Sequence, residues 1–300
     1  MYKMKQKKKI KLGEFDPKCT KFPYPKQTDQ HYLTVAKDNG VVLDENYPYI
    51  DKSFKFRFEY GFVRFLLHFI VFLVAKIRLG LKIEGRKNIK KHKELLKNGV
   101  VSVCNHVHMW DFIGIMKAIL PFKANILVWH KNVKGELAWF VRNVGGIPIP
   151  TDNLKGLKAQ IKAVDNLLEN GGWLHICAEG SMWEYYKPIR PFRTGAAHYA
   201  IKNNKPILPL AFSYRKPGWI RRKIFHQIAL FTLNVGEPIY PNNELEGKQK
   251  EIEFTKRAHQ EVCKLAGIKP YKNLYKPVFN NDQRIDYYAD KYGEGYKTSR

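Results

Sequence analysis

Apolar and polar positions alternate with two different periods along the middle of the chain. Short apolar runs predict buried strands at residues 100–104, 126–129, 173–177, 207–212 and 228–235. Apolar residues at helical spacing predict helices at 111–120, 136–142, 153–170, 194–202 and 246–266. Strands that alternate with helices favour an α/β fold, with a mainly parallel sheet flanked by helices on both faces.

The same pattern divides the chain into four parts. Residues 1–50 are rich in Lys, Pro, Tyr and Asp with little periodicity, which predicts a basic, partly ordered arm. Residues 51–81 are aromatic, basic and helical in pattern, and 82–268 form the predicted α/β domain. Residues 269–300, a tail rich in Tyr, Asn and Asp, show no strong period.

The segment 51–81 contains an apolar run at 65–75 between Arg64 and Lys76. About 20 apolar residues are needed to cross a bilayer as a helix, so these eleven do not predict a spanning helix. Interleaved Phe, Lys and Arg residues favour an N-terminal membrane-associated helix, with cations on headgroups and rings at the acyl boundary. A helix packed on the core of its own domain is the alternative, and the sequence leaves both open.

Composition narrows the class of protein. With 300 residues, of which 44% are hydrophobic and 14% aromatic, the chain can bury a full core, which excludes a disordered or fibrous protein. A net charge of +26 indicates a polyanionic partner: nucleic acid, an anionic membrane surface or a phosphorylated substrate. The four cysteines have no short paired spacing, so we expect reduced thiols, a cytoplasmic protein and no zinc site: Cys19, Cys104, Cys177 and Cys263.

The first candidate chemistry lies between the strand 100–104 and the helix that follows it. His106 falls in the connecting loop, and Asp111 falls in the first helical turn. The carboxylate can bond one imidazole nitrogen there and leave the other as a base for an incoming hydroxyl. A polar loop with a helix-capping Asp is the alternative.

A second polar loop follows the strand 173–177. It begins with Glu179, Gly180 and Ser181 and continues to Lys187, Arg190 and Arg193. A glycine beside an acid lets a substrate approach the backbone closely, and the cations can hold an anion. The alternative is a surface loop with a solvated charge cluster.

Four short sequence blocks follow one another along the predicted α/β domain: NHVHMWD at 105–111, GIPIPTDN at 146–153, AEGS at 178–181 with PFRTG at 191–195, and ILPLA at 207–211. Over roughly residues 80–240 the chain resembles the glycerolipid acyltransferase family typified by bacterial 1-acylglycerol-3-phosphate acyltransferase. A lone His-x4-Asp motif is weak, but four blocks in the family's order are a strong signal.

The resemblance implies an O-acyltransferase that acylates a lysophosphatidate-like glycerolipid. His106 is then the general base on the acceptor hydroxyl and Asp111 orients it, with no covalent acyl-enzyme, because a thioester already carries a good leaving group. Glu179 and Gly180 are implied to bind the acceptor, and Pro209 to line the acyl site. The donor is acyl-CoA or acyl carrier protein, with no cofactor and no metal, at the cytoplasmic face of the cell membrane as a peripheral or monotopic protein.

The chain departs from the family pattern at two positions. Asn153 and Met182 stand where the family has arginines near the acceptor phosphate, and neither can supply the missing charge. Either Lys155, Lys187, Arg190 and Arg193 compensate, or the acceptor is another lysolipid or a glycolipid. A catalytically weak membrane scaffold, and a basic nucleic-acid-binding protein without a recognisable nucleic-acid motif, are the competing classes.

Overall fold

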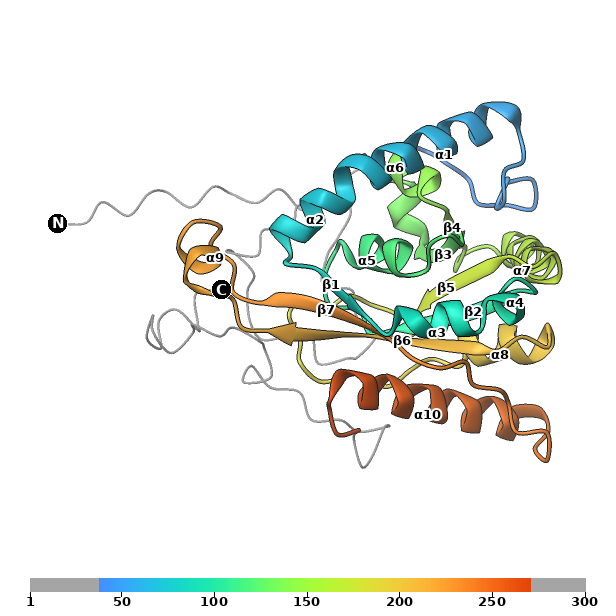
Figure 1. Ribbon diagram of the computed structural model, residues 1–300. Helices are drawn as coiled ribbons and strands as arrows, with labels where there is room; N and C mark the ends of the chain where they lie inside the picture. Colours follow the sequence, from blue (N-terminus) through green and yellow to red (C-terminus); the bar gives the residue numbers. More distant parts are fainter. Residues whose placement is uncertain (1–37, 271–300) are drawn as a thin grey trace.

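The computed structural model describes residues 38–270, with a seven-stranded sheet at its centre (Figure 1). The strand order is β1-β7-β6-β2-β5-β3-β4. All neighbouring pairs are parallel except β6 and β7. The predicted mainly parallel α/β fold is therefore confirmed. Most of the predicted arm, nearly all of the tail and Cys19 lie outside the described residues.

Two of the predicted strands have the bounds observed in the structure, and the others differ by a few residues. The strands are β1 Lys82–Glu84, β2 Val100–Cys104, β3 Ala124–Trp129, β4 Gly146–Ile149, β5 Trp173–Cys177, β6 Ile207–Arg215 and β7 Leu230–Val235. The sequence missed β1 and β4. In β4, glycine and proline suggested a turn, but Pro148 is tolerated because β4 is an edge strand.

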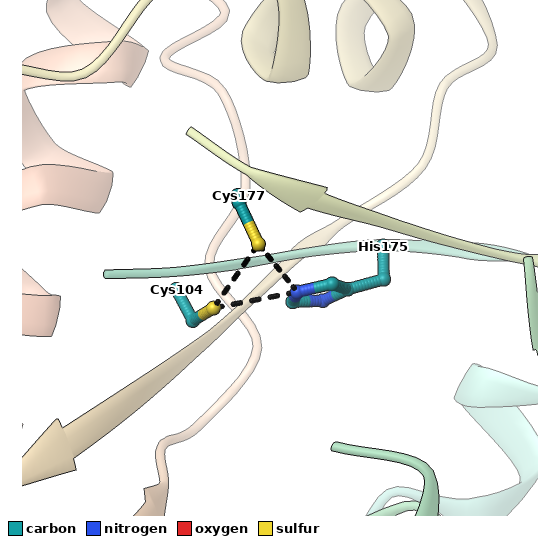
Figure 2. Close-up of side chains that lie close together, drawn as sticks. All are labelled: Cys104, His175 and Cys177. Carbon is teal, nitrogen blue, oxygen red and sulfur yellow. Dashed lines mark hydrogen bonds between the residues drawn. The ribbon is translucent and has the colours of Figure 1, made fainter. Parts of the chain in front are cut away.

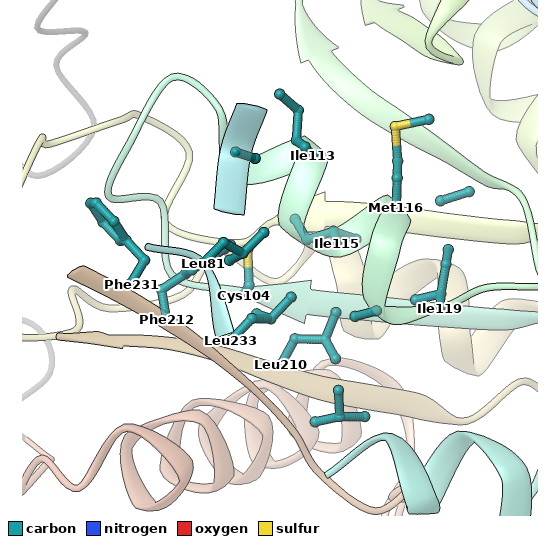
Figure 3. Packing of buried hydrophobic residues seen from close by; sticks show 14 of the residues in the cluster. Leu81, Cys104, Ile113, Ile115, Met116, Ile119, Leu210, Phe212, Phe231 and Leu233 are labelled. Carbon is teal, nitrogen blue, oxygen red and sulfur yellow. The ribbon is translucent and has the colours of Figure 1, made fainter. Parts of the chain in front are cut away.

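Helices cover both faces of the sheet (Figure 1). They are α1 Phe54–Leu66, α2 Phe72–Arg78, α3 Arg86–Lys91, α4 Lys93–Leu96, α5 Asp111–Ala118, α6 Ala138–Asn143, α7 Leu154–Glu169, α8 Gly195–Lys202, α9 Trp219–Lys223 and α10 Gly247–Ala266. One apolar cluster joins α2 and α5 to the sheet, and Figure 3 shows its packing around Ile113, Ile115 and Phe212. A second cluster joins α7, α8 and α10 to the opposite face.

The N-terminal helix lies within the segment 51–81 that the sequence predicted to be helical. α1, a π-helical turn Leu67–Val71 and α2 form one continuous helix of 25 residues, Phe54–Arg78. Among the described residues this helix alone is long and apolar enough, by length and composition, to cross a membrane. The eleven-residue apolar run is therefore part of a longer helix, and the way this helix meets a membrane stays a prediction. Arg64, which precedes the run, lies over the Tyr60 ring and bonds the carbonyl of Ala124.

Candidate active site

His106 and Asp111 meet at the carboxyl end of β2. His106 Nδ1 lies 2.9 Å from Asp111 Oδ2, and the same oxygen accepts the backbone N–H groups of Val107 and His108. Asp111 is the first residue of α5 and is buried, whereas the His106 side chain is 27% exposed. The Asp111 carboxylate thus fixes the loop and holds the ring at Nδ1. The exposed part of the imidazole is available to a substrate.

The electrostatics of this pair include a third group. Burial alone would lower the pKa of the His106 imidazole. Cys177 and Asp111 together have the larger, opposite effect and raise this pKa to about 10. Burial raises the pKa of Asp111 to about 6 against the opposing effect of His106. A hydrogen bond with Cys104 lowers the pKa of Cys177 well below its ordinary value, despite burial. The Cys177 thiol is thus part of the electrostatic environment of His106.

The residue before the histidine fixes the loop to the sheet. The side-chain amide of Asn105 donates to the carbonyl of Phe212 at 3.0 Å and accepts the Phe212 N–H at 2.7 Å. This reciprocal pair ties the end of β2 to the middle of β6. The sequence showed that Asn105 precedes His106, but it did not indicate that the Asn105 side chain bonds Phe212, 107 residues away.

Glu179 connects the two polar loops. Its carboxylate accepts the backbone N–H of His106 at 2.9 Å, the backbone N–H of Arg190 at 2.6 Å and the Arg190 guanidinium at 2.9 Å. Backbone bonds from Trp183 to His106 and from Tyr185 to Val107 join the same loops. The structure thus brings the loops together as predicted, through one buried carboxylate.

The residues 80–213, which contain both loops, match the model of the family described as Acyltransferase. This match runs from just before β1 into β6. An uncharacterized acyltransferase of Schizosaccharomyces pombe is 23% identical over 202 residues, which cover 65% of this chain and 67% of that protein. The crystal structure of the 1-acyl-sn-glycerophosphate (LPA) acyltransferase, PlsC, from Thermotoga maritima covers 70% of this chain and 88% of its own, with 17% identity and a TM-score of 0.44.

Arg190 occupies a different place from the one expected. Its guanidinium is fully buried, pairs with Glu179, bonds the hydroxyl and carbonyl oxygens of Ser181 and lies 4.4 Å from the centre of the Trp183 ring. The prediction placed Glu179, Ser181 and Arg190 against the substrate. In the structure these three residues bond one another, because a buried carboxylate and guanidinium each need a partner.

The other predicted cations differ from Arg190. Lys187 and Arg193 are both exposed. Gly180 adopts a left-handed backbone conformation with φ +79°, and a Cβ atom there would lie 2.5 Å from Arg193 Nε. Gly180 is therefore needed for the turn and for the close approach of Arg193. Binding of an anion by Lys187 and Arg193 stays a prediction.

Four further positions singled out in the sequence have structural environments of their own. Asn153 caps α7, since its side chain accepts the N–H of Gly156, and Met182 is buried. Lys155 of α7 pairs with Glu45 at the surface. Pro209 is buried on the face of β6 that packs against α10, where a Cβ at Gly236 would meet both Pro209 and Leu265. Pro209 therefore lies on the opposite side of the sheet from α1 and α2. Its role in lining an acyl site stays a prediction.

His108, the second histidine of this loop, is buried beside a carboxylate. Its Nε2 lies 3.3 Å from the buried Glu184 carboxylate. Burial, together with the charges of His106 and Arg78, lowers the pKa of His108 to about 3. A ring this acidic is a poor base at neutral pH. Of the two histidines in the loop, His106 has the environment of a general base.

The fold brings together two cysteines that are far apart in the sequence. Cys104 and Cys177 end the neighbouring strands β2 and β5, with their sulfurs 3.9 Å apart and His175 beside both (Figure 2). Cys104, Cys177 and Cys263 are free thiols. Spacing along the chain gave no sign of this group, because strand pairing alone brings its members together.

Proposed function

We propose that the protein is a membrane-associated O-acyltransferase that transfers a fatty acyl group from an acyl thioester to a hydroxyl of a lysophosphatidate-like glycerolipid. The observation that carries this proposal is the His106–Asp111 pair, 2.9 Å apart at the carboxyl end of β2 within an acyltransferase-family domain. The four ordered sequence blocks, which resemble the glycerolipid acyltransferases, supply the acceptor class.

The proposed chemistry is a single displacement. The imidazole of His106 accepts the proton of the acceptor hydroxyl while the hydroxyl oxygen attacks the thioester carbonyl. The carbon–sulfur bond breaks, and the thiolate of coenzyme A or acyl carrier protein leaves and takes up a proton. The reactive form has a neutral imidazole, because only an unprotonated ring nitrogen can accept that proton. Asp111 holds the ring and stabilises the imidazolium that forms.

The membrane part of the proposal depends on the outer face of the long helix. Large apolar side chains on that face are exposed at helical spacing: Phe54, Phe58, Phe62, Phe65, Phe69, Leu73 and Ile77. The inner face packs on the domain through Val63, Leu67 and Ala75. A helix with one face against protein and the other apolar and open suits the lipid interface of a monotopic protein. The net charge of +26 favours an anionic surface.

The experiment is an acyl-transfer assay of the purified full-length protein. Labelled acyl-CoA and acyl carrier protein are offered with lysophosphatidate, other lysophospholipids and a glycolipid, and products are separated by thin-layer chromatography. We expect acylation of lysophosphatidate and its loss in His106→Ala, with vesicle binding retained. Failure of every acceptor, or an unchanged rate in His106→Ala, overturns the proposal.

A second acceptor class is favoured by a specific observation. The two family arginines are replaced by Asn153, which caps a helix, and by Met182, which is buried. A site that lacks both guanidinium groups suits an acceptor without a phosphate monoester, such as another lysolipid or a glycolipid. Faster acylation of one of those acceptors than of lysophosphatidate would select this class. Salt-sensitive DNA binding without vesicle binding would instead select the nucleic-acid class.

A further inference from the structure

We propose that Cys104, His175 and Cys177 form a binding site for a thiophilic divalent metal ion of the zinc class. Figure 2 shows the two sulfur atoms and one ring nitrogen directed toward one another from neighbouring strands. His175 Nε2 lies 3.4 Å from Cys104 Sγ and 3.8 Å from Cys177 Sγ, and the sulfurs are 3.9 Å apart. Two thiolates and an imidazole are a ligand set that zinc prefers over the harder cations.

The distances between the three donor atoms agree with those in a tetrahedral site. Zinc–sulfur bonds of about 2.3 Å and zinc–nitrogen bonds of about 2.0–2.1 Å, at a tetrahedral angle, place two sulfurs about 3.8 Å apart and sulfur and nitrogen about 3.6 Å apart. The observed separations of 3.9, 3.4 and 3.8 Å differ from these by about 0.2 Å or less. The donors therefore need little movement to bind the ion.

Strand pairing sets this geometry. β2 and β5 are parallel with Ser102 opposite His175 and Cys104 opposite Cys177. Because side chains two residues apart in a strand point to the same face, all four project to one side of the sheet. Cys104 and His175 are fully buried. The site is therefore part of the rigid sheet, which resists the rearrangement that a loop allows.

A second layer of hydrogen bonds orients the histidine. His175 Nδ1 lies 2.8 Å from Ser102 Oγ, and Ser102 Oγ accepts the indole N–H of Trp173 at 2.7 Å. Ser102 can donate its own proton to the carbonyl of Leu174. In that arrangement His175 carries its proton on Nδ1 and directs the Nε2 lone pair at the sulfurs. Metal-bound histidines are held in the same way by a partner at the other ring nitrogen.

Three protein ligands leave a fourth position open. Cys104 is two residues before His106, and the Cys177 thiol is close enough to raise the pKa of His106. A bound ion would thus lie next to the imidazole and compete with a substrate proton for its lone pair. Inhibition of acyl transfer by Zn²⁺, reversed by a chelator, follows; this consequence rests on the proposed function, whereas metal binding itself does not.

Cobalt binding tests the site without any substrate. Full-length protein, reduced and stripped with a chelator under anaerobic conditions, is titrated with Co²⁺ and followed by absorption. We expect one cobalt per chain, a near-ultraviolet thiolate-to-cobalt charge-transfer band and the visible bands of tetrahedral cobalt, all displaced by Zn²⁺. Ser102→Ala is expected to weaken binding roughly 10–100-fold. A folded, reduced protein that gives no charge-transfer band overturns the site.

Variants assign the ligands, with one matched control. Cys104→Ser, Cys177→Ser and His175→Gln should each lose the charge-transfer band or reduce it severely. Cys263→Ser should keep it, although Cys263 is also a buried thiol beside a histidine, His259. A band that persists in Cys177→Ser, or disappears in Cys263→Ser, overturns the assignment. Circular dichroism confirms folding, and if the buried Cys104 variant fails to fold, the half-buried Cys177 variant decides.

Discussion

At the carboxyl end of β2, one oxygen of Asp111 lies within hydrogen-bond distance of His106 and two backbone N–H groups, and Glu179 bonds two loops at once. The outer face of the Phe54–Arg78 helix has the opposite construction. Its phenylalanines are more than half exposed and form a stripe at helical spacing. The first region depends on a few directional bonds in a buried setting, and the second depends on apolar area.

The buried polar network and the exposed apolar face should tolerate different kinds of substitution. A buried polar network fails when one partner is removed, because the remaining group loses both its partner and access to water. An apolar surface loses affinity gradually, in proportion to the area removed. Substitutions in the two regions should therefore differ in both the size and the kind of their effect.

The largest effect is expected at the base. His106→Ala should lower the acyl-transfer rate on the order of 10²–10⁴-fold, because proton transfer by a positioned side chain contributes about that much. Initial rates with labelled acyl-CoA measure it, and vesicle binding should not change. His198→Ala is the control, since this exposed histidine pairs with Glu251 on the far helices α8 and α10. A His108→Ala variant that alone lost activity would contradict the assignment of the base.

Breaking the buried pair should cost stability. Glu179→Gln leaves the guanidinium of Arg190 buried without its counter-charge, and we expect a loss of roughly 3–5 kcal/mol in the free energy of unfolding. Urea denaturation measures it. Lys202→Gln, which breaks a partly exposed pair with Asp165, should cost less than about 1 kcal/mol. Equal losses in the two variants would show that burial of the pair is not what matters.

The apolar stripe should affect membrane binding alone. In Phe62→Ser/Phe65→Ser the vesicle affinity should fall on the order of tenfold or more, because a Phe side chain transferred from water contributes about 1.5–3 kcal/mol. Sedimentation with anionic vesicles measures it, and the unfolding curve should stay the same. Leu154→Ser is the control, an exposed apolar residue on α7 outside the stripe. The same loss in both variants would contradict a specific lipid-facing surface.

The smallest effect is expected at the exposed cation of the second loop. Lys187→Gln should raise the KM for a phosphate-bearing acceptor by at most roughly fivefold, since exposed charge pairs contribute about 0.2–1 kcal/mol. The KM for an uncharged acceptor should not change. An equal rise for both acceptors would show that Lys187 acts on the fold of the loop and not on the phosphate.

Several elements of the fold could be predicted from the sequence because their signals are local. The strands 100–104 and 173–177 are short apolar runs bounded by polar residues, and they were found with the observed bounds. The edge strand Gly146–Ile149 was missed, since proline and glycine signal a turn unless pairing on one side suffices. The antiparallel pairing of β6 with β7 had no local signal either.

In the candidate site, the sequence determined the pair with the chemistry. A strand, a loop and a helix start within twelve residues allow His106 and Asp111 to meet. A capped polar loop fits the same spacing, and the resemblance of the four blocks favoured the pair. Spacing could not predict that Arg190 would be buried against Glu179. Whether Arg190 faces solvent or the Glu179 carboxylate depends on how the two loops pack. That packing also involves Asn105, whose hydrogen-bond partner Phe212 is distant in sequence.

The sequence is enough to predict the alternation of strands and helices, the closeness of His106 to Asp111, and a basic, aromatic N-terminal helix, because periodicity and short spacing act over a few residues. Two features depended on the tertiary structure: Glu179 links two loops, and Cys104 meets His175 and Cys177. Both arise from pairing and burial between segments about 70 residues apart, where strand register and loop packing set every distance.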